Sequence, residues 1–142
     1  MLKGVAAVWV GRLLGGDSEW IAALCGIAAI IGHNWPIYFR FRGGKGIATT
    51  LGVMATLTFF PVLIAGIIAI LSIIFTKYVS LGSLIFVLLT PIFLVFSNEI
   101  SPYFWASLII CVFAFWRHRT NIVKIAQGKE NKLGSKGGKR VA

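Results

Sequence analysis

Three cations and three glycines crowd one short stretch, and their types and spacing point to chemistry. The cations are Arg40, Arg42 and Lys45, and the glycines are Gly43, Gly44 and Gly46. Glycines let a backbone turn its N–H groups inward, because no Cβ stands in the way. An apolar segment suited to a helix follows from Ile47, and the first N–H groups of a helix carry partial positive charge. The stretch therefore predicts an anion site, most naturally for phosphate.

This loop is not a Walker A motif, which needs Gly-x-x-x-x-Gly-Lys-[Ser/Thr] after a strand. Phe39 stands where the first glycine should be, and Gly46 follows Lys45. Composition alone is equally compatible with a basic loop at a membrane surface, because lysine and arginine accumulate on cytoplasmic loops. The order of the residues favours the phosphate site.

Three further stretches with polar residues flank the apolar segments. His33 either caps carbonyl groups where a helix ends or acts as a donor or base near the phosphate site. Ser80 and Ser83 share a helix face because they are three residues apart, although a helix cap and a small-residue packing face would use the same residues. After the last apolar segment, a stop-transfer cluster explains the arginines but neither Asn121 nor the segment Gly128-x-Glu130.

The order of these residues resembles the bacterial acyl-phosphate:glycerol-3-phosphate acyltransferases, the PlsY family. Residues 32–36 and 41–49 are similar to its second motif, a Gly-His-x-x-Pro segment that runs into Phe-[Arg/Lys]-Gly-Gly-Lys-Gly-x-Ala-Thr. Residues 77–83 resemble its third motif. Residues 118–122 resemble the His-Arg-x-Asn-Ile element after its last helix.

The resemblance implies an acyl transfer from acyl phosphate to glycerol-3-phosphate, which gives lysophosphatidate and inorganic phosphate in phospholipid biosynthesis. The implied partners are these two substrates and membrane lipids, with no cofactor and no metal. Acyl phosphate is already activated, so the protein need only hold two anions, align the glycerol hydroxyl and screen developing charge. The implied catalytic residues are His33, Lys45 and Asn121. The implied substrate-binding residues are Arg42, Gly43, Gly44, Gly46, Thr49, Ser80, Ser83, His118 and Arg119.

The chain departs from the family at its start. Members begin with another apolar helix and a Gly-Ser-Gly-Asn-type first motif that also lines the site, whereas this sequence starts where the second helix would begin. We therefore expect either a misassigned start or a truncated, inactive copy. The alternative from another class is a non-enzymatic membrane anion-binding or carrier subunit, and the oligomeric state is left open.

Composition places the chain in a membrane. Of its 142 residues, 58% are hydrophobic and only 13% are charged, whereas a soluble domain has about 25% charged residues. The net charge of +10 then points to a cytoplasmic face, anionic headgroups or an anionic substrate rather than to nucleic acid. Asp17, Glu19 and Glu99 fall in turns and Glu130 in the tail, which argues against a proton relay.

The elements that must position the site are helices. Apolar runs cover residues 4–14, 20–31, 47–76, 79–97 and 103–116, and the long run is expected to form a hairpin broken at Phe60-Pro61. We therefore predict an all-α integral membrane bundle of about six transmembrane helices, one fewer than in full-length relatives. The bundle would cover residues 1–120, and residues 121–142 would form a basic cytoplasmic tail that is disordered at its end. The hairpin collects the cations on one face, so we expect a multi-pass protein of the bacterial cytoplasmic membrane whose active site and C-terminus face the cytoplasm.

Overall fold

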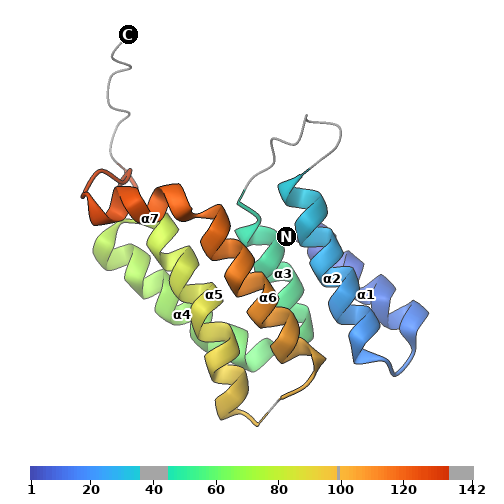
Figure 1. Ribbon diagram of the computed structural model, residues 1–142. Coiled ribbons are helices and arrows are strands. Elements are labelled where there is room, and N and C mark those ends of the chain that lie inside the picture. The colour runs from blue at the N-terminus through green and yellow to red at the C-terminus, as the bar shows by residue number, and fades with distance from the viewer. Residues whose placement is uncertain (36–44, 99, 135–142) are drawn as a thin grey trace.

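The computed structural model describes residues 1–35, 45–98 and 100–134, and every regular element in them is a helix (Figure 1). The helices are α1 (Leu2–Gly15), α2 (Glu19–Asn34), α3 (Ile47–Leu57), α4 (Phe59–Thr76), α5 (Val79–Phe96), α6 (Pro102–Arg117) and α7 (Arg119–Ala126). By length and composition, α4 and α5 could each cross a membrane, and α2, α3 and α6 are shorter apolar helices. The predicted all-α class is confirmed.

The long apolar run forms the expected hairpin, and Thr58 makes its break. Thr58 leaves the helical conformation with φ −143° and ψ 84°, and its hydroxyl donates to the carbonyl of Met54 at 3.2 Å. Pro61 lies in the first turn of α4, where its missing N–H removes no helical hydrogen bond. The break therefore lies slightly before the predicted Phe60-Pro61, because the proline helps to start the second helix instead of ending the first.

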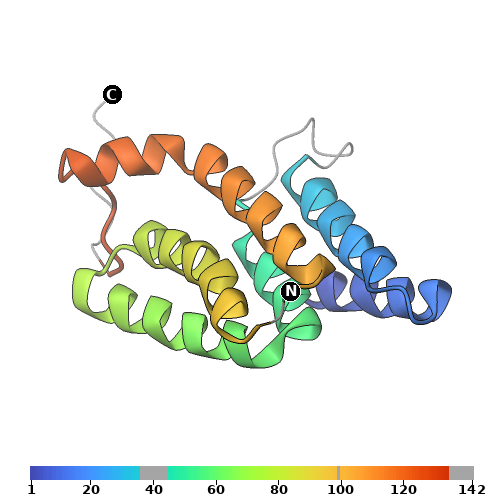
Figure 2. The same ribbon diagram turned by 60° about the horizontal axis from the view of Figure 1, so that its bottom comes forward.

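Two helical hairpins flank a central pair of helices. In Figures 1 and 2, α1 and α2 pack together on one side, α4 and α5 on the other, and α3 and α6 lie between them. Val8, Val53 and Leu94 are among the fully buried core side chains. At one end of the bundle, the rings of Trp35 and Phe113 meet edge to face with centroids 5.0 Å apart, which ties the end of α2 to α6.

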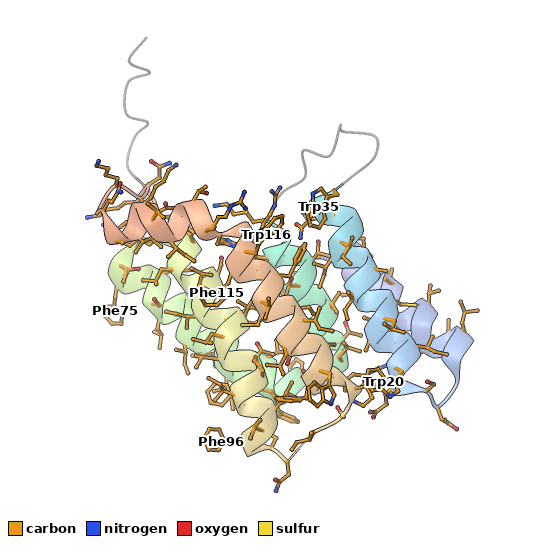
Figure 3. All side chains as sticks on the ribbon, in the orientation of Figure 1. Trp20, Trp35, Phe75, Phe96, Phe115 and Trp116 are labelled. Carbon is orange, nitrogen blue, oxygen red and sulfur yellow. The ribbon has the colours of Figure 1, made fainter. Side chains whose placement is uncertain are left out.

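The outer surface of the bundle is apolar. Phe75 is 82% exposed and Phe96 is 80% exposed, and both side chains point away from the helices in Figure 3. Such side chains are costly in water but match the hydrocarbon interior of a bilayer. The exposed surface thus agrees with the predicted membrane bundle.

The segment after α7 returns to the bundle. The backbone N–H of Leu133 donates to the carbonyl of Lys77 at 2.7 Å, and the ammonium of Lys132 lies 5.8 Å from the ring centroid of Tyr78. Residues 127–134 therefore form a strap beside the turn between α4 and α5. The division at residue 120 stays a prediction, and the expected disorder of the last residues falls on 135–142, outside the described part of the chain.

Candidate functional site

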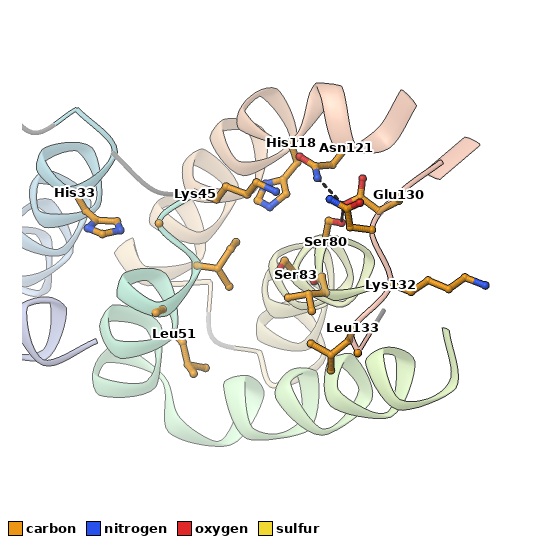
Figure 4. Close-up of a pocket in the computed structure, with 16 residues that line it drawn as sticks. His33, Lys45, Leu51, Ser80, Ser83, His118, Asn121, Glu130, Lys132 and Leu133 are labelled. Carbon is orange, nitrogen blue, oxygen red and sulfur yellow. Dashed lines mark hydrogen bonds between the residues drawn. The ribbon is translucent and has the colours of Figure 1, made fainter. Parts of the chain in front are cut away.

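One cavity of about 890 Å³ gathers most of the predicted site residues. It lies at the end of the bundle where α3 and α5 begin and α2 and α6 end (Figure 4). Seven predicted residues line it: His33, Lys45, Gly46, Ser80, Ser83, His118 and Asn121. The hairpin of α3 and α4 thus brings Lys45 and the serine pair to the same end of the molecule.

Gly46 shapes the wall of the cavity at the start of α3. Its φ of +76° is left-handed, a conformation that side chains with a Cβ rarely adopt, and a Cβ there would lie 2.7 Å from Oδ1 of the buried Asn34. The carbonyl of Gly46 accepts the first helical hydrogen bond, from the N–H of Thr50 at 2.8 Å. The neighbouring Lys45 points across the cavity toward His118 (Figure 4).

Glu130 of the strap connects two predicted residues across the cavity. Its Oε1 accepts a hydrogen bond from Oγ of Ser80 at 2.5 Å and another from Nδ2 of Asn121 at 2.7 Å. These are the dashed lines in Figure 4. The second carboxylate oxygen, Oε2, is buried and has no hydrogen-bond partner among the described residues. Glu130 therefore fixes two polar side chains and leaves one acceptor unused.

The surroundings of Glu130 favour its charged form. Burial by itself would raise the pKa of this carboxyl, but hydrogen bonds from Ser80 and Asn121 and the charges of Lys45 and Lys124 outweigh burial. The net effect holds the pKa of Glu130 below its usual value. Glu130 is therefore a carboxylate at neutral pH.

His118 is held in one tautomer at the junction of α6 and α7. Only 1% of the residue is exposed, and its Nδ1 lies 3.0 Å from the carbonyl oxygen of Ala114. A carbonyl can only accept, so Nδ1 carries the proton and Nε2 is left as an acceptor without a partner in the described structure. Burial lowers the pKa of His118, and the charges of Lys45 and Arg117 act in the same direction, against the Ala114 hydrogen bond and Glu130. The ring is neutral at pH 7.

His33 contacts a cation that the sequence analysis did not consider. Its Nδ1 lies 2.5 Å from Nζ of Lys3, the residue near the start of α1. An ammonium group can only donate, so Nδ1 accepts and the neutral ring carries its proton on Nε2. The predicted cap on helix carbonyls is not the contact described for this ring, and His33 instead lines the cavity.

Residues 1–128 match the sequence profile of the family described as glycerol-3-phosphate acyltransferase. The chain belongs to this family. A member from Shouchella clausii is 55% identical over 94% of this chain and 68% of its own length. A member from Halalkalibacterium halodurans is 51% identical over 96% of this chain and 68% of its own length. The predicted family is confirmed, and nothing in these relatives supports the non-enzymatic alternative.

Solved structures of a family member have the same fold. PlsY (YgiH), described as an integral membrane glycerol 3-phosphate acyltransferase, matches with a TM-score of 0.87 and 28% identity in its glycerol 3-phosphate form. Its lysophosphatidic acid form gives the same values. The match covers 94% of this chain and 67–68% of the two chains. The prediction of an integral membrane helical bundle is confirmed.

Not every site residue expected from the family resemblance reaches the cavity. Thr49 is buried on the side of α3 that faces Gly4 of α1, and it does not line the cavity. Arg119 is exposed and lies with its guanidinium 4.9 Å from the ring centroid of Trp116, so it also stays outside the cavity lining. The remaining predicted members, Arg42, Gly43 and Gly44, lie outside the described residues.

Sequence reasoning missed Glu130 and Lys3 as neighbours of the site. The sequence places Glu130 in the tail, and it does not connect Lys3 with the site. Gly128, two residues before Glu130, has a φ of +66°, so the chain reversal that returns Glu130 to the cavity had a signal in the sequence. No comparable signal pointed to Lys3, because its contact with His33 depends on how α1 packs beside α2.

Proposed function

We propose that this chain transfers an acyl group from acyl phosphate to glycerol-3-phosphate and releases lysophosphatidate and inorganic phosphate. The observation that carries the proposal is the single cavity in which Lys45, Ser80, His118 and Asn121 meet. It offers a cation, hydroxyl and amide groups and one neutral acceptor. The two forms of PlsY, with glycerol 3-phosphate and with lysophosphatidic acid, name a substrate and a product of this chemistry.

The reaction needs no covalent intermediate on the protein. A hydroxyl oxygen of glycerol-3-phosphate attacks the acyl carbonyl carbon, the new ester C–O bond forms, and the bond from that carbon to the phosphate oxygen breaks. The hydroxyl proton leaves, and the released phosphate can accept it. Since acyl phosphate is an activated anhydride, orientation of the two substrates and screening of charge supply the catalysis.

Lys45 and the start of α3 provide the anion-binding side of the cavity. The ammonium of Lys45 points into the cavity, and the first N–H groups of α3 follow directly after Gly46. Positive charge and free N–H groups at a helix N-terminus favour a phosphate there. We assign this side of the cavity to a substrate phosphate. Lys45 would assist the departure of that phosphate by screening its negative charge.

His118 is placed to orient the attacking hydroxyl. Its Nε2 is buried, unpartnered among the described residues and unable to donate, so a substrate hydroxyl is a suitable partner. Accepting that hydrogen bond would point a lone pair of the hydroxyl oxygen at the acyl carbon. Ser80, Ser83 and Asn121 complete the polar wall opposite Lys45.

We also propose that the cavity faces the cytoplasm of a bacterium. Lys45 lines the cavity, and Lys3 and Lys77 contact the lining residues His33 and Leu133. Arg12 instead lies near the other end of α3, where its Nη2 donates to the carbonyl of Thr56 at 2.9 Å. Positive charge accumulates on the cytoplasmic side of membrane proteins. The C-terminal strap, which lines the cavity, would then lie on the same side.

The proposed activity is tested with the purified full chain in lipid nanodiscs. Palmitoyl phosphate is supplied with and without glycerol-3-phosphate, and phosphate release is followed. We expect release to depend on glycerol-3-phosphate and to match lysophosphatidate formed by mass spectrometry. Binding of glycerol-3-phosphate without any turnover would contradict the proposal and favour the anion-binding alternative.

A further inference from the structure

An apolar groove of about 580 Å³ runs along the outer face of α6. Its lining residues recur every three or four positions, so they form a single stripe on the helix. They are Trp105, Leu108, Ile109, Val112, Phe113 and Trp116. None of these residues lines the polar cavity. The groove is therefore separate from the site of the proposed reaction.

The groove is open to the surroundings of the bundle. Val112 is 73% exposed and Ile109 is 56% exposed, and every residue that lines the groove belongs to α6. In a membrane, such a face meets either lipid or the apolar surface of another helix. The two ends of the groove and its length distinguish between these occupants.

A cation lies at the end of the groove nearest the polar cavity. The guanidinium of Arg119 lies 4.9 Å from the ring centroid of Trp116, and its Nη1 donates to the carbonyl of Trp116 at 3.1 Å. Arg119 is exposed, and this hydrogen bond uses one of the five N–H donors of a guanidinium. Arg119 therefore offers a positive charge and further donors where the apolar groove begins.

The ring beneath this cation is held by other aromatic rings. The centroid of Trp116 lies 5.9 Å from that of Trp35 and 6.1 Å from that of Phe113, and both tryptophans lie at the same end of the bundle (Figure 3). Tryptophan is enriched in membrane proteins at the level of the lipid headgroups. The charged end of the groove thus suits a headgroup, and its apolar part runs inward from there.

The length of the groove matches one leaflet of a bilayer. The residues from Trp105 to Trp116 span about 16 Å along the helix axis, and half of a hydrocarbon core is about 15 Å. A transmembrane helix of a second copy would need a face about twice as long and no cation at its end. A lipid acyl chain below a charged headgroup fits both the length and the charge.

We propose that this groove binds an anionic glycerophospholipid of the surrounding membrane, with its phosphate on Arg119 and one acyl chain along α6. The net charge of +10 agrees with an anionic lipid, because basic residues beside a membrane attract anionic headgroups. The assignment also gives a role to Arg119, which the family resemblance implied as a substrate-binding residue and which lies outside the cavity lining. The lipid would bind next to His118, at the junction of α6 and α7, without entering the cavity.

Native mass spectrometry of the full chain in detergent micelles tests the headgroup. The probes are phosphatidylglycerol, which is anionic, and phosphatidylcholine, which is zwitterionic, with identical acyl chains. Wild type should bind phosphatidylglycerol about fivefold more tightly, the effect of one basic residue beside an anionic lipid, and Arg119→Gln should lose this preference. Lys124→Gln removes one charge from another exposed residue of α7 outside the groove lining, so it is the matched control and should keep the preference.

Three results of that experiment would overturn the assignment. The first is equal binding of the two lipids by wild type. The second is the same loss of preference in Arg119→Gln and Lys124→Gln, which would indicate a diffuse attraction to the basic end of the molecule. The third is a dimer of the chain that Val112→Trp abolishes, which would assign the groove to a second copy.

The acyl part of the proposal is tested by filling the groove. Val112→Trp adds a large side chain at an exposed position, so we expect a folded protein. It should weaken the binding of both lipids by about tenfold, equivalent to the loss of about two buried CH₂ groups, and leave the preference for phosphatidylglycerol unchanged. Ile67→Trp, at a residue of α4 that is 51% exposed and outside the groove, is the matched control. Wild-type affinity in Val112→Trp would contradict the groove.

Photolabelling of the wild-type chain gives an answer that does not depend on the folding of any variant. Phosphatidylglycerol with a diazirine in one acyl chain is photolysed in nanodiscs that contain an excess of phosphatidylcholine, and the labelled peptides are mapped. Labels on residues 105–116 should exceed those on the exposed residues of α4, whereas phosphatidylcholine with the same diazirine should label both helices alike. An even spread of the phosphatidylglycerol label over α4 and α6 would overturn the proposal.

Discussion

Glu130 shows at the residue scale how one carboxylate can organise a polar cavity. Ser80 and Asn121 come from different helices, yet both donate to the same oxygen. Hydrogen bonds to a charged acceptor are stronger than neutral ones, so the charge of Glu130 holds both side chains in place. Without it, the hydroxyl and the amide would be free to turn.

The first prediction concerns that charge. Glu130→Gln keeps an acceptor oxygen but removes the charge, so we expect a loss of about 1 kcal/mol in stability, the typical worth of a hydrogen bond in a protein, and a lower kcat/KM. The melting temperature in nanodiscs and steady-state kinetics measure the two effects. Glu19→Gln, a substitution at the start of α2 away from the cavity, is the control. Equal behaviour of the two variants would contradict the organising role.

The same group predicts an effect of acid on stability. The pKa of Glu130 is lowered from 4.5 in the folded protein, so its stabilisation is fully present above that value and is lost as the pH falls through the folded pKa. Between pH 6 and pH 3, the melting temperature of wild type should therefore fall further than that of Glu130→Gln. Parallel curves for the two proteins would show that Glu130 does not contribute.

A second residue, His118, predicts the pH dependence of the reaction. Its pKa is lowered from 6.5, so Nε2 is an available acceptor at neutral pH and becomes protonated only as the pH falls below that value. We expect kcat/KM of the wild type to fall on acidification, because protonation of Nε2 removes the acceptor. His118→Gln should lose about 100-fold in kcat/KM at neutral pH. The variant should also lack the part of the acidic decline that comes from protonation of His118. Since the second pKa of a phosphate ester is also about 6, any decline that persists in the variant belongs to the substrate. Identical pH profiles would contradict the role of His118.

At the scale of the helices, the turn that joins Lys45 to α3 depends on Gly46. Gly46→Ala would force a Cβ into a left-handed residue and against Asn34, which costs about 1–3 kcal/mol. We expect a lower melting temperature together with reduced turnover, because Lys45 is attached to this turn. Gly32→Ala is the matched control, since a Cβ at Gly32 in α2 would meet nothing within 4 Å. A loss at both positions alike would argue against a specific requirement at Gly46.

The helices themselves were largely predictable, and the reason is their apolar length. The runs at 79–97 and 103–116 differ little from α5 and α6, and Pro102 starts α6 as its place in the sequence indicates. The hairpin followed from charge, because Lys45 and Lys77 had to share one end. The residue at which the hairpin breaks was harder to predict, since a proline can end one helix and also suits the first turn of the next.

The site was predictable where it depends on helix periodicity and on motif order, and not where it depends on tertiary folding. Ser80 and Ser83 share a face because of their spacing, and both line the cavity. Glu130 enters the site through a chain reversal and a contact between Leu133 and Lys77, which no local periodicity encodes. The segment around Glu130 is polar and has no apolar periodicity, so the sequence predicts a tail there. In the structure this segment contributes the carboxylate that connects α5 and α7.

For the molecule as a whole, the arrangement separates an apolar body from one polar end. The helices present large apolar side chains outward (Figure 3), and the cavity collects residues from α2, α3, α5, α7 and the strap at a single end. An enzyme that joins a water-soluble phosphate ester to a membrane-bound acyl chain needs both surfaces in contact. Ile47 and Leu51 line both the cavity and an apolar groove between α3, α4 and α5, so a polar and an apolar surface meet there.

The most direct test of the central claim is lysophosphatidate formation by Lys45→Ala. Lys45 points into the cavity (Figure 4), and its ammonium is the charge assigned to the substrate phosphate. With palmitoyl phosphate and glycerol-3-phosphate, we expect the variant to lose at least about 100-fold in kcat/KM, while Lys129→Ala, outside the cavity lining, retains the wild-type value. Product formed by Lys45→Ala at the wild-type rate would contradict the account.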